Sequence, residues 1–153
     1  MTHHMYLPVA FIVASTLSAG AQEKKIDQAS LPPAVQKTIQ EQSQGATVKG
    51  FSTERENGKR VYEAEMLING HSKDVQIAEG GTLMEVEEEI AFNQLPRKVQ
   101  AALAAKAGGA KISKVESLTK HDRLVAYEAS TLKGTHKGEV QVGPDGGDLP
   151  HAE

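Results

Sequence analysis

Two segments of the chain carry an apolar residue at every fourth position. The two sets are Leu31, Val35 and Ile39, and Leu95, Val99 and Leu103. Because residues four apart lie on one side of an α-helix, each segment is predicted to be a helix with a single buried stripe. Proline follows the first leucine of each set, where a first helical turn tolerates it, and Gly45 and Gly108 supply the ends.

Alternation of apolar and polar residues predicts β-strands between and after these helices. In the stretch Val61–Ile68, Tyr62 and Ala64 would face the core, while Glu63 and Glu65 would point away from it. The Asn-Gly pair just before this stretch is a strong hairpin signal. The stretch is therefore predicted to be one strand of an antiparallel sheet with a single buried face.

Two of the predicted strands break this alternation in the same way. Apolar residues lie three apart at Val48 and Phe51, and again at Ile112 and Val115. One extra residue in a strand restores the alternation on both sides of it. A β-bulge is therefore predicted inside each of the two intervals.

The predicted elements occur twice in the same order. The sequence VYEAE at residues 61–65 returns as AYEAS at 126–130, and the segments around each copy return with it. We therefore predict an α+β fold of two tandem repeats, each with one helix followed by a three- to four-stranded antiparallel meander sheet. The first repeat is assigned to residues 31–90 and the second to residues 91–149.

Both ends of the chain are expected to lie outside the repeats. Residues 7–17 are apolar and lead into the small-residue sequence SAGA, which ends in an A-x-A pattern. This run is too short to span a bilayer, so residues 1–21 are predicted to be a secretory signal peptide, with an uncleaved anchor as the alternative. Residues 22–30 are polar and are predicted to be a flexible lead, and residues 150–153 a tail. We expect a periplasmic or secreted protein with no stable membrane insertion after cleavage.

Composition and motifs argue against nucleic-acid binding and against catalysis. The net charge is −3 and no basic stripe with stacking aromatics is present, so nucleic-acid binding is not expected. No G-x-S-x-G elbow and no helix-borne His-Glu pair occur, so we predict no catalytic residue, no cofactor and no enzymatic activity. The run Asp145–Asp148 is interpreted as a plain turn, because it lacks the further oxygen ligands of a calcium loop. His71, His121 and His136 lack metal-binding spacing and are expected to be exposed turn residues, so no metal ligand is assigned.

The strand predicted at residues 82–90 carries an acidic residue at every second position. Glu85, Glu87 and Glu89 share one face of this strand, and Val86 lies on the other. If the strands pair in sequence order, further acids join that face. The predicted partner-binding residues are then Glu63, Glu65, Asp74, Glu85, Glu87 and Glu89. Two interpretations stay open: a solvated face that protects an edge strand, and a docking surface for a basic partner or a weak Ca²⁺ site.

The combined motifs resemble a known family. A helix that begins at Leu-Pro, a strand with Val-x-x-Phe or Ile-x-x-Val, a Tyr-Glu-Ala strand and a turn at Gly-Gly resemble the PepSY-like family of secreted bacterial proteins. That family is similar to the tandem-repeat beta-lactamase inhibitory proteins. The resemblance covers residues 31–149 and implies a non-catalytic module that binds an unidentified envelope or secreted protein, with a peptidase as one candidate partner. The alternative is a cation or small-ligand binding module that uses the acidic face.

Overall fold

The computed structural model describes residues 23–153, and both predicted helices are present. Helix α1 spans Pro33–Gln42 and helix α2 spans Arg97–Ala107. Each begins two residues after the first leucine of its apolar set, because a proline at the cap position holds extended backbone there. The six residues of the two sets are nevertheless all buried, with exposures from 0 to 6%. The buried helical stripes are therefore confirmed.

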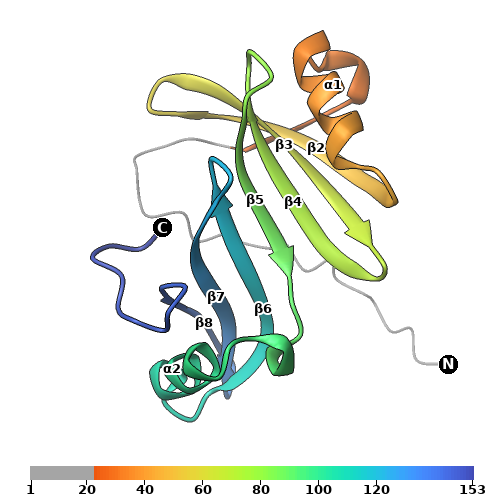
Figure 1. Ribbon diagram of the computed structural model, residues 1–153. Coiled ribbons are helices and arrows are strands. Elements are labelled where there is room, and N and C mark those ends of the chain that lie inside the picture. The colour runs from red at the N-terminus through yellow and green to blue at the C-terminus, as the bar shows by residue number, and fades with distance from the viewer. Residues whose placement is uncertain (1–22) are drawn as a thin grey trace, which may run out of the picture.

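Eight strands form a single antiparallel sheet. Figure 1 shows how the strands and the two helices are arranged. The strands are β1 (Lys24–Ile26), β2 (Ala46–Glu56), β3 (Lys59–Ile68), β4 (His71–Ala78), β5 (Leu83–Glu89), β6 (Lys111–Lys120), β7 (Arg123–Lys133) and β8 (His136–Val142). Each strand pairs only with its neighbours in the sequence, from β1 at one edge to β8 at the other. The predicted α+β class with an antiparallel meander is confirmed. The sheet is continuous through its middle because β5 pairs with β6.

Hairpins and bulges fall where the sequence places them. Asn57 and Gly58 both have positive φ, at 49° and 79°, which is the geometry of a tight two-residue hairpin between β2 and β3. The pairing of β2 with β3 shifts between Val48 and Gly50, and that of β6 with β7 shifts between Ile112 and Lys114. Both predicted bulges are confirmed.

The segment before α1 differs from expectation. Residues 22–30 were expected to be a flexible lead, but Lys24–Ile26 pairs with β2 and a short 3-10 turn follows at Gln28–Ser30. Ile26 explains the difference, since it lies opposite Phe51 and packs against the apolar core. A single apolar residue suffices to hold a three-residue edge strand on a sheet already formed by β2.

The hydrophobic core lies between the sheet and the two helices. Both helices pack on the same face of the sheet, α1 over β3 and β4 and α2 over β6 to β8 (Figure 1). The α1 side buries Tyr62, Ala64, Met66, Val75 and Ile77, and the α2 side buries Val115, Tyr127, Ala129 and Val142. Thr53, Val86 and Thr119 belong to the same face by register. All of the carboxylates described below lie on the other face, except where stated.

Each helix packs closely against a turn at a position that only glycine can occupy without a clash. A Cβ on Gly81, in the turn before β5, would lie 2.9 Å from the carbonyl oxygen of Ala34, and the hydroxyl of Thr38 donates to the Gly81 carbonyl at 2.6 Å. A Cβ on Gly146, in the turn after β8, would lie 2.8 Å from the carbonyl oxygen of Lys98. Both glycines have positive φ, at 89° and 83°. Close backbone contact with a turn therefore fixes where each helix lies.

The expected signal peptide, residues 1–21, lies outside the described residues. Within residues 23–153, neither helix has the length and apolar character needed to cross a bilayer.

Candidate functional site

The face of the sheet opposite the helices, here called the helix-free face, carries two rows of acidic residues. In the first row Glu65 lies opposite Asp74, and Asp74 lies opposite Glu87. The neighbouring row is Glu89, Glu116 and Glu128, on β5, β6 and β7. Facing like charges destabilise a sheet. Such an arrangement therefore needs protons, cations or a partner to relieve the repulsion.

The six predicted partner-binding residues all lie on this face. They are Glu63, Glu65 and Asp74 from β3 and β4, and Glu85, Glu87 and Glu89 from β5. Only Glu65 is exposed, and the other five are partly buried. Glu88, between two of them, is exposed and lies on the helix side opposite Lys73. The expected alternation along β5 is thus present, but the acids are withdrawn from water rather than fully solvated.

The predicted set of partner-binding residues leaves out four charged residues that lie among the acidic rows. They are Lys114, Glu116, Lys120 and Glu128. The missing information was that β5 pairs with β6, which carries the acidic surface across the middle of the sheet. The sequence holds one usable signal, since Lys114 and Glu116 flank Val115 along a single predicted strand.

The centre of the face holds three carboxylates in close contact. Oxygen atoms of Asp74, Glu87 and Glu116 all lie within 4.8 Å of one another. The ammonium group of Lys114 forms an ion pair with Glu116, and both side chains are largely buried, with exposures of 15% and 10%. Lys114 also acts on Asp74, whose pKa it lowers against the effect of burial. Lys114 therefore already offsets part of the negative charge of these three carboxylates.

Burial holds protons on several of these acids. Loss of water around Glu63, followed by repulsion from Asp74, raises the pKa of Glu63 from 4.5 to about 7. Burial raises the pKa of Asp74 from 3.8 to about 6, with Lys114 opposing the change and Glu116 adding to it. For Glu87, burial and then Glu85 raise the pKa well above its usual range. Part of the face is therefore uncharged near neutral pH, and its negative charge grows as Asp74, Glu63 and then Glu87 ionise with rising pH.

A second polar group lies where β4, β5 and β6 meet. The backbone N–H of Ser72 donates to Glu89 at 3.0 Å, and its hydroxyl lies 3.4 Å from Glu89 and 3.5 Å from Glu116. The Nδ1 atom of His71 lies 3.8 Å from Glu89. These contacts hold the Glu89 carboxylate in place, at the β5 end of the row formed by Glu89, Glu116 and Glu128.

The chain after β8 reaches the same face. The N–H of Glu153 donates to the side-chain oxygen of Gln141 at 2.9 Å, and Gln141 in turn donates to Glu128 at 2.6 Å. The ammonium group of Lys120 lies 3.4 Å from the Glu153 carboxylate and 3.6 Å from that of Glu85. The tail expected at residues 150–153 therefore ends on the acidic face.

Exposed histidines and the run Asp145–Asp148 are the remaining candidates from the sequence. His71, His121 and His136 are exposed, as expected, and in the described part of the chain no histidine belongs to a group that could hold a metal ion. The run Asp145–Asp148 is a turn in which Gly147 donates its N–H to the Asp145 carboxylate at 2.9 Å. The Asp148 carboxylate pairs instead with Lys106 on α2, at 2.8 Å, and this contact lowers its pKa.

The aromatic residues within residues 23–153 lie in the core or pack against it. Tyr62 and Tyr127 are 4% and 8% exposed, while Phe51 and Phe92 are partly buried and pack against the apolar clusters. Exposed aromatic side chains are the usual anchors of tight protein interfaces. Binding through the helix-free face would therefore lack aromatic anchors and depend on charge, hydrogen bonds and the exposed apolar side chains of Leu67 and Leu132.

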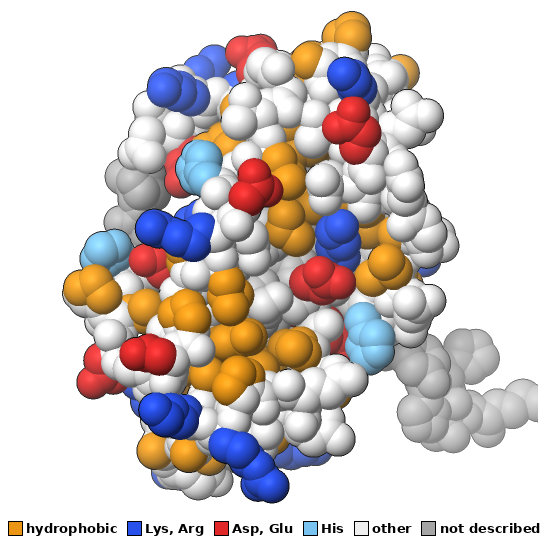
Figure 2. Space-filling view, in the orientation of Figure 1, with side chains coloured by type: hydrophobic (Ala, Val, Ile, Leu, Met, Phe, Trp, Pro, Cys, Tyr) orange, Lys and Arg blue, Asp and Glu red, His pale blue; other side chains and the backbone are white. Residues whose placement is uncertain are grey.

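The helix side of the molecule has a different character. Figure 2 shows hydrophobic side chains gathered on this side over the sheet, with charged residues around them. Partly buried apolar residues on this side include Val86, Leu124 and Phe92. These residues pack against the two apolar clusters, so the hydrophobic side chains on this side are the outer part of the core.

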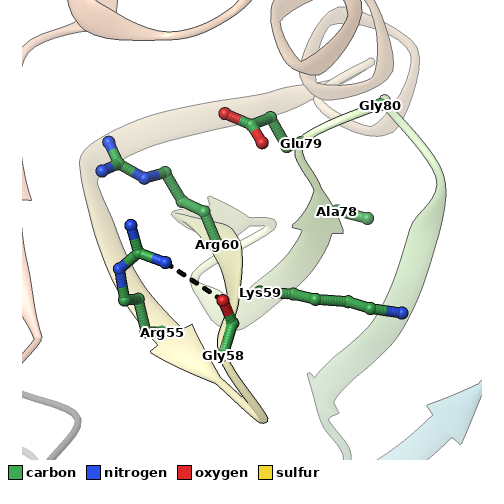
Figure 3. A pocket seen from close by; sticks show the side chains of 7 residues that line it. All are labelled: Arg55, Gly58, Lys59, Arg60, Ala78, Glu79 and Gly80. Atoms are coloured by element: carbon green, nitrogen blue, oxygen red, sulfur yellow. Dashed lines mark hydrogen bonds between the residues drawn. The ribbon is translucent and has the colours of Figure 1, made fainter.

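A basic pocket lies at the tip of the β2–β3 hairpin, beside the turn after β4 (Figure 3). It has a volume of about 490 Å³, and its charged lining residues are Arg55, Lys59, Arg60 and Glu79. Arg55 and Arg60 lie directly opposite each other, and Arg55 donates to the Gly58 carbonyl at 3.0 Å. These cations are exposed, so water solvates them and the like-charge pair is tolerated.

Neither a known protein family nor a curated protein matches this chain. Solved structures do share the fold. A BLIP-like protein from Bacteroides fragilis is 20% identical with a TM-score of 0.59, and the match covers 78% of this chain and 83% of that one. A candidate periplasmic protein from Bacteroides eggerthii is 16% identical with a TM-score of 0.62, covering 76% and 84%. A DUF2874 family protein from Bacteroides uniformis is 17% identical with a TM-score of 0.61, covering 78% and 86%.

These likenesses concern the fold. They place the chain among α+β proteins with a BLIP-like arrangement of sheet and helices. Of the three, the Bacteroides eggerthii protein is a candidate periplasmic protein.

Proposed function

We propose that this protein is an exported, non-catalytic binding module that recognises another envelope or secreted protein through its helix-free face. The observation that carries the proposal is the pair of acidic rows, whose carboxylates are mostly half-buried and outnumber the lysines among them. An ordinary solvated surface would leave these groups in water. A partly enclosed set of excess carboxylates instead fits a partner that supplies basic side chains.

The raised pKa values define how such binding would depend on pH. At pH 6 Asp74 is about half protonated and Glu63 largely protonated, since their pKa values are about 6 and about 7. A lysine or arginine from the partner favours the ionised carboxylates, so binding releases these protons. Affinity is expected to rise between pH 6 and pH 8. It is also expected to fall with added salt, because the attraction is electrostatic.

The further proposals concern organisation and partner. Matched contacts support two PepSY-like repeats: the Gln36 and Gln100 side chains donate to Leu31 and Leu95 at 2.9 and 2.8 Å. The predicted signal peptide supports export to the periplasm or beyond. The fold likeness to a BLIP-like protein supports a protein as the partner, and a peptidase remains the first candidate.

The test is capture of the partner from envelope extract. The chain from residue 22 onward is immobilised, and retained proteins are compared with those held by a variant in which Glu85, Glu87 and Glu89 are replaced by glutamine. A matched control replaces acids of the helix side and turns, Glu41, Glu79 and Asp122, by their amides. A protein retained by the native chain and the control, but lost from the face variant, supports the proposal. Retention by all three chains places binding elsewhere.

A cation site is the second candidate, and the close approach of Asp74, Glu87 and Glu116 favours it. Oxygen ligands suit Ca²⁺, but Lys114 already holds a positive charge against Glu116, and an incoming ion must displace it. The test is thermal unfolding with and without millimolar CaCl₂, because an ion bound only by the folded chain raises the melting temperature. A rise that disappears in Asp74→Asn supports the site. An unchanged melting temperature rules out binding in this range.

A further inference from the structure

The segment 149–153 makes a specific set of contacts on the helix-free face. Figure 1 shows the chain leaving β8, making a turn, and ending beside the β6–β7 hairpin. Gln141 binds the backbone of Glu153 with both ends of its amide: the oxygen accepts from the N–H at 2.9 Å, and the nitrogen lies 3.4 Å from the carbonyl oxygen. Lys120 binds the Glu153 side chain at 3.4 Å. One residue is thus recognised through its backbone and through its charge.

The subsite that holds Glu153 is fixed by the sheet. Glu128 accepts from the Gln141 amide nitrogen at 2.6 Å, which determines which way the amide points. Lys120 lies 3.6 Å from Glu85, so a second carboxylate holds the ammonium group in place. Gln141, Glu128 and Lys120 come from three adjacent strands. Rigid elements therefore present a backbone-binding amide and a cation side by side.

The occupant is held only lightly. In the segment 149–153, Pro150, His151 and Ala152 are exposed, while Leu149 and Glu153 are partly buried. The contacts are two hydrogen bonds from or to Gln141, one ion pair with Lys120 and the partial burial of Leu149, and each is weak where water can compete. No strand or helix follows Val142 in the described chain. The segment can therefore leave the face without unfolding the sheet.

We propose that residues 149–153 form a displaceable strap that occupies a peptide-binding subsite of the helix-free face. The subsite takes one residue of an extended segment, by its backbone through Gln141 and by an acidic side chain through Lys120. This inference rests on the proposed function, because the segment that replaces the strap belongs to the partner. It also defines the partner's surface: basic side chains against the acidic rows, and one acidic residue against Lys120.

The first test follows the strap in the full mature chain by amide hydrogen exchange and ¹⁵N relaxation. In the native protein, the amide of Glu153 is expected to be ordered. Gln141→Glu removes the donor and adds a negative charge beside Glu128 and Glu153, so it should release the segment. Thr47→Glu is the control for added charge, since Thr47 is exposed on the same face, on β2 opposite Leu67 and away from the strap. A segment equally mobile in the native chain and in Gln141→Glu would overturn the proposal.

The second test does not depend on that variant folding. A chain that ends at Asp148 is titrated with a synthetic peptide of residues 149–153, and chemical shifts of the Gln141 side-chain amide are followed. The peptide should bind the shortened chain with a dissociation constant of about 0.1 mM and the full chain about tenfold more weakly, because the tethered strap competes at an effective concentration of about 1 mM. A peptide carrying Glu153→Gln should bind more weakly than the native peptide. Absence of shifts in the shortened chain, or equal shifts in both chains, would overturn the proposal.

The outcomes separate the strap from the proposed function. If the strap covers the subsite nine-tenths of the time, a partner should bind the shortened chain about tenfold more tightly. A partner that binds both chains equally, and still requires the acidic rows, would overturn the strap and leave the proposed function intact. An ordered strap, together with a partner whose binding does not require the acidic rows, would overturn the proposed function and leave the strap intact.

Discussion

Replacing Glu63 by glutamine tests how strongly the helix-free face opposes folding at neutral pH. Glu63 lies on β3 opposite Ser52 and Gln76, and burial raises its pKa from 4.5 to about 7. The folded chain therefore binds this proton more tightly than the unfolded chain does. The stability that results is fully present below about pH 4.5 and is lost as the pH rises through about 7. Asp74 acts in the same sense between about pH 4 and pH 6.

The magnitude follows from the gap between the two pKa values of Glu63. A change from 4.5 to about 7 corresponds to about 3 kcal/mol of unfolding free energy. Water that reaches a partly buried side chain reduces this figure, so we expect Glu63→Gln to stabilise the fold by roughly 1–2 kcal/mol at pH 8. At pH 4.5 the glutamate is protonated in the folded chain, and the two proteins should differ little.

The assay is urea unfolding followed by circular dichroism from pH 4.5 to pH 8.5. Glu65→Gln is the control, because Glu65 lies on the same strand and face but is exposed. Native and control chains should lose stability as the pH rises, while Glu63→Gln should lose less. A native chain whose stability increases from pH 5 to pH 8, or a glutamine variant that is less stable at pH 8, would refute the reasoning.

Three further outcomes are expected in equilibrium unfolding. Leu103→Ala, at a fully buried position of α2, should lower the unfolding free energy by about 2–5 kcal/mol, and a loss below 1 kcal/mol would mean that α2 is poorly packed. Gly81→Ala should destabilise by more than about 1 kcal/mol, whereas Gly80→Ala, which meets open space, should change stability by less than about 0.5 kcal/mol. Arg60→Gln should raise the unfolding free energy slightly, by about 0.2–1 kcal/mol, because it removes the like charge opposite Arg55; a loss of stability would mean that attraction between Arg60 and Glu79 outweighs this repulsion.

Local elements could be predicted because each depends on residues close in sequence. The apolar spacing at Val99 and Leu103 is enough to place a helix on the core, and an Asn-Gly pair is enough to place a hairpin. The bulges followed from apolar residues three apart. In each case the physical cause, a side-chain period or a backbone preference at one turn, is contained in a window of a few residues.

Contacts between distant segments were harder to predict. Lys24–Ile26 pairs with β2, but two lysines and one isoleucine carry no strand pattern. The alternation at 85–89 correctly placed three carboxylates on one face, yet nothing in that stretch indicates that Glu116 would lie beside them. That neighbour depends on which strand pairs with β5, and pairing is decided by the whole sheet. Half-burial of these acids could not be predicted for the same reason.

The order of strands in the sheet is also their order in the chain. Most paired residues are therefore near in sequence, and this low contact order favours rapid folding. During synthesis from the N-terminus, each new strand can pair with the strand that precedes it in the sequence. No strand has to be inserted between two strands that are already paired. The finished sheet ends at β8, but each intermediate ends at an earlier strand whose open edge is paired only later. The topology that allows the sheet to grow one strand at a time thus also exposes each intermediate to pairing with another chain.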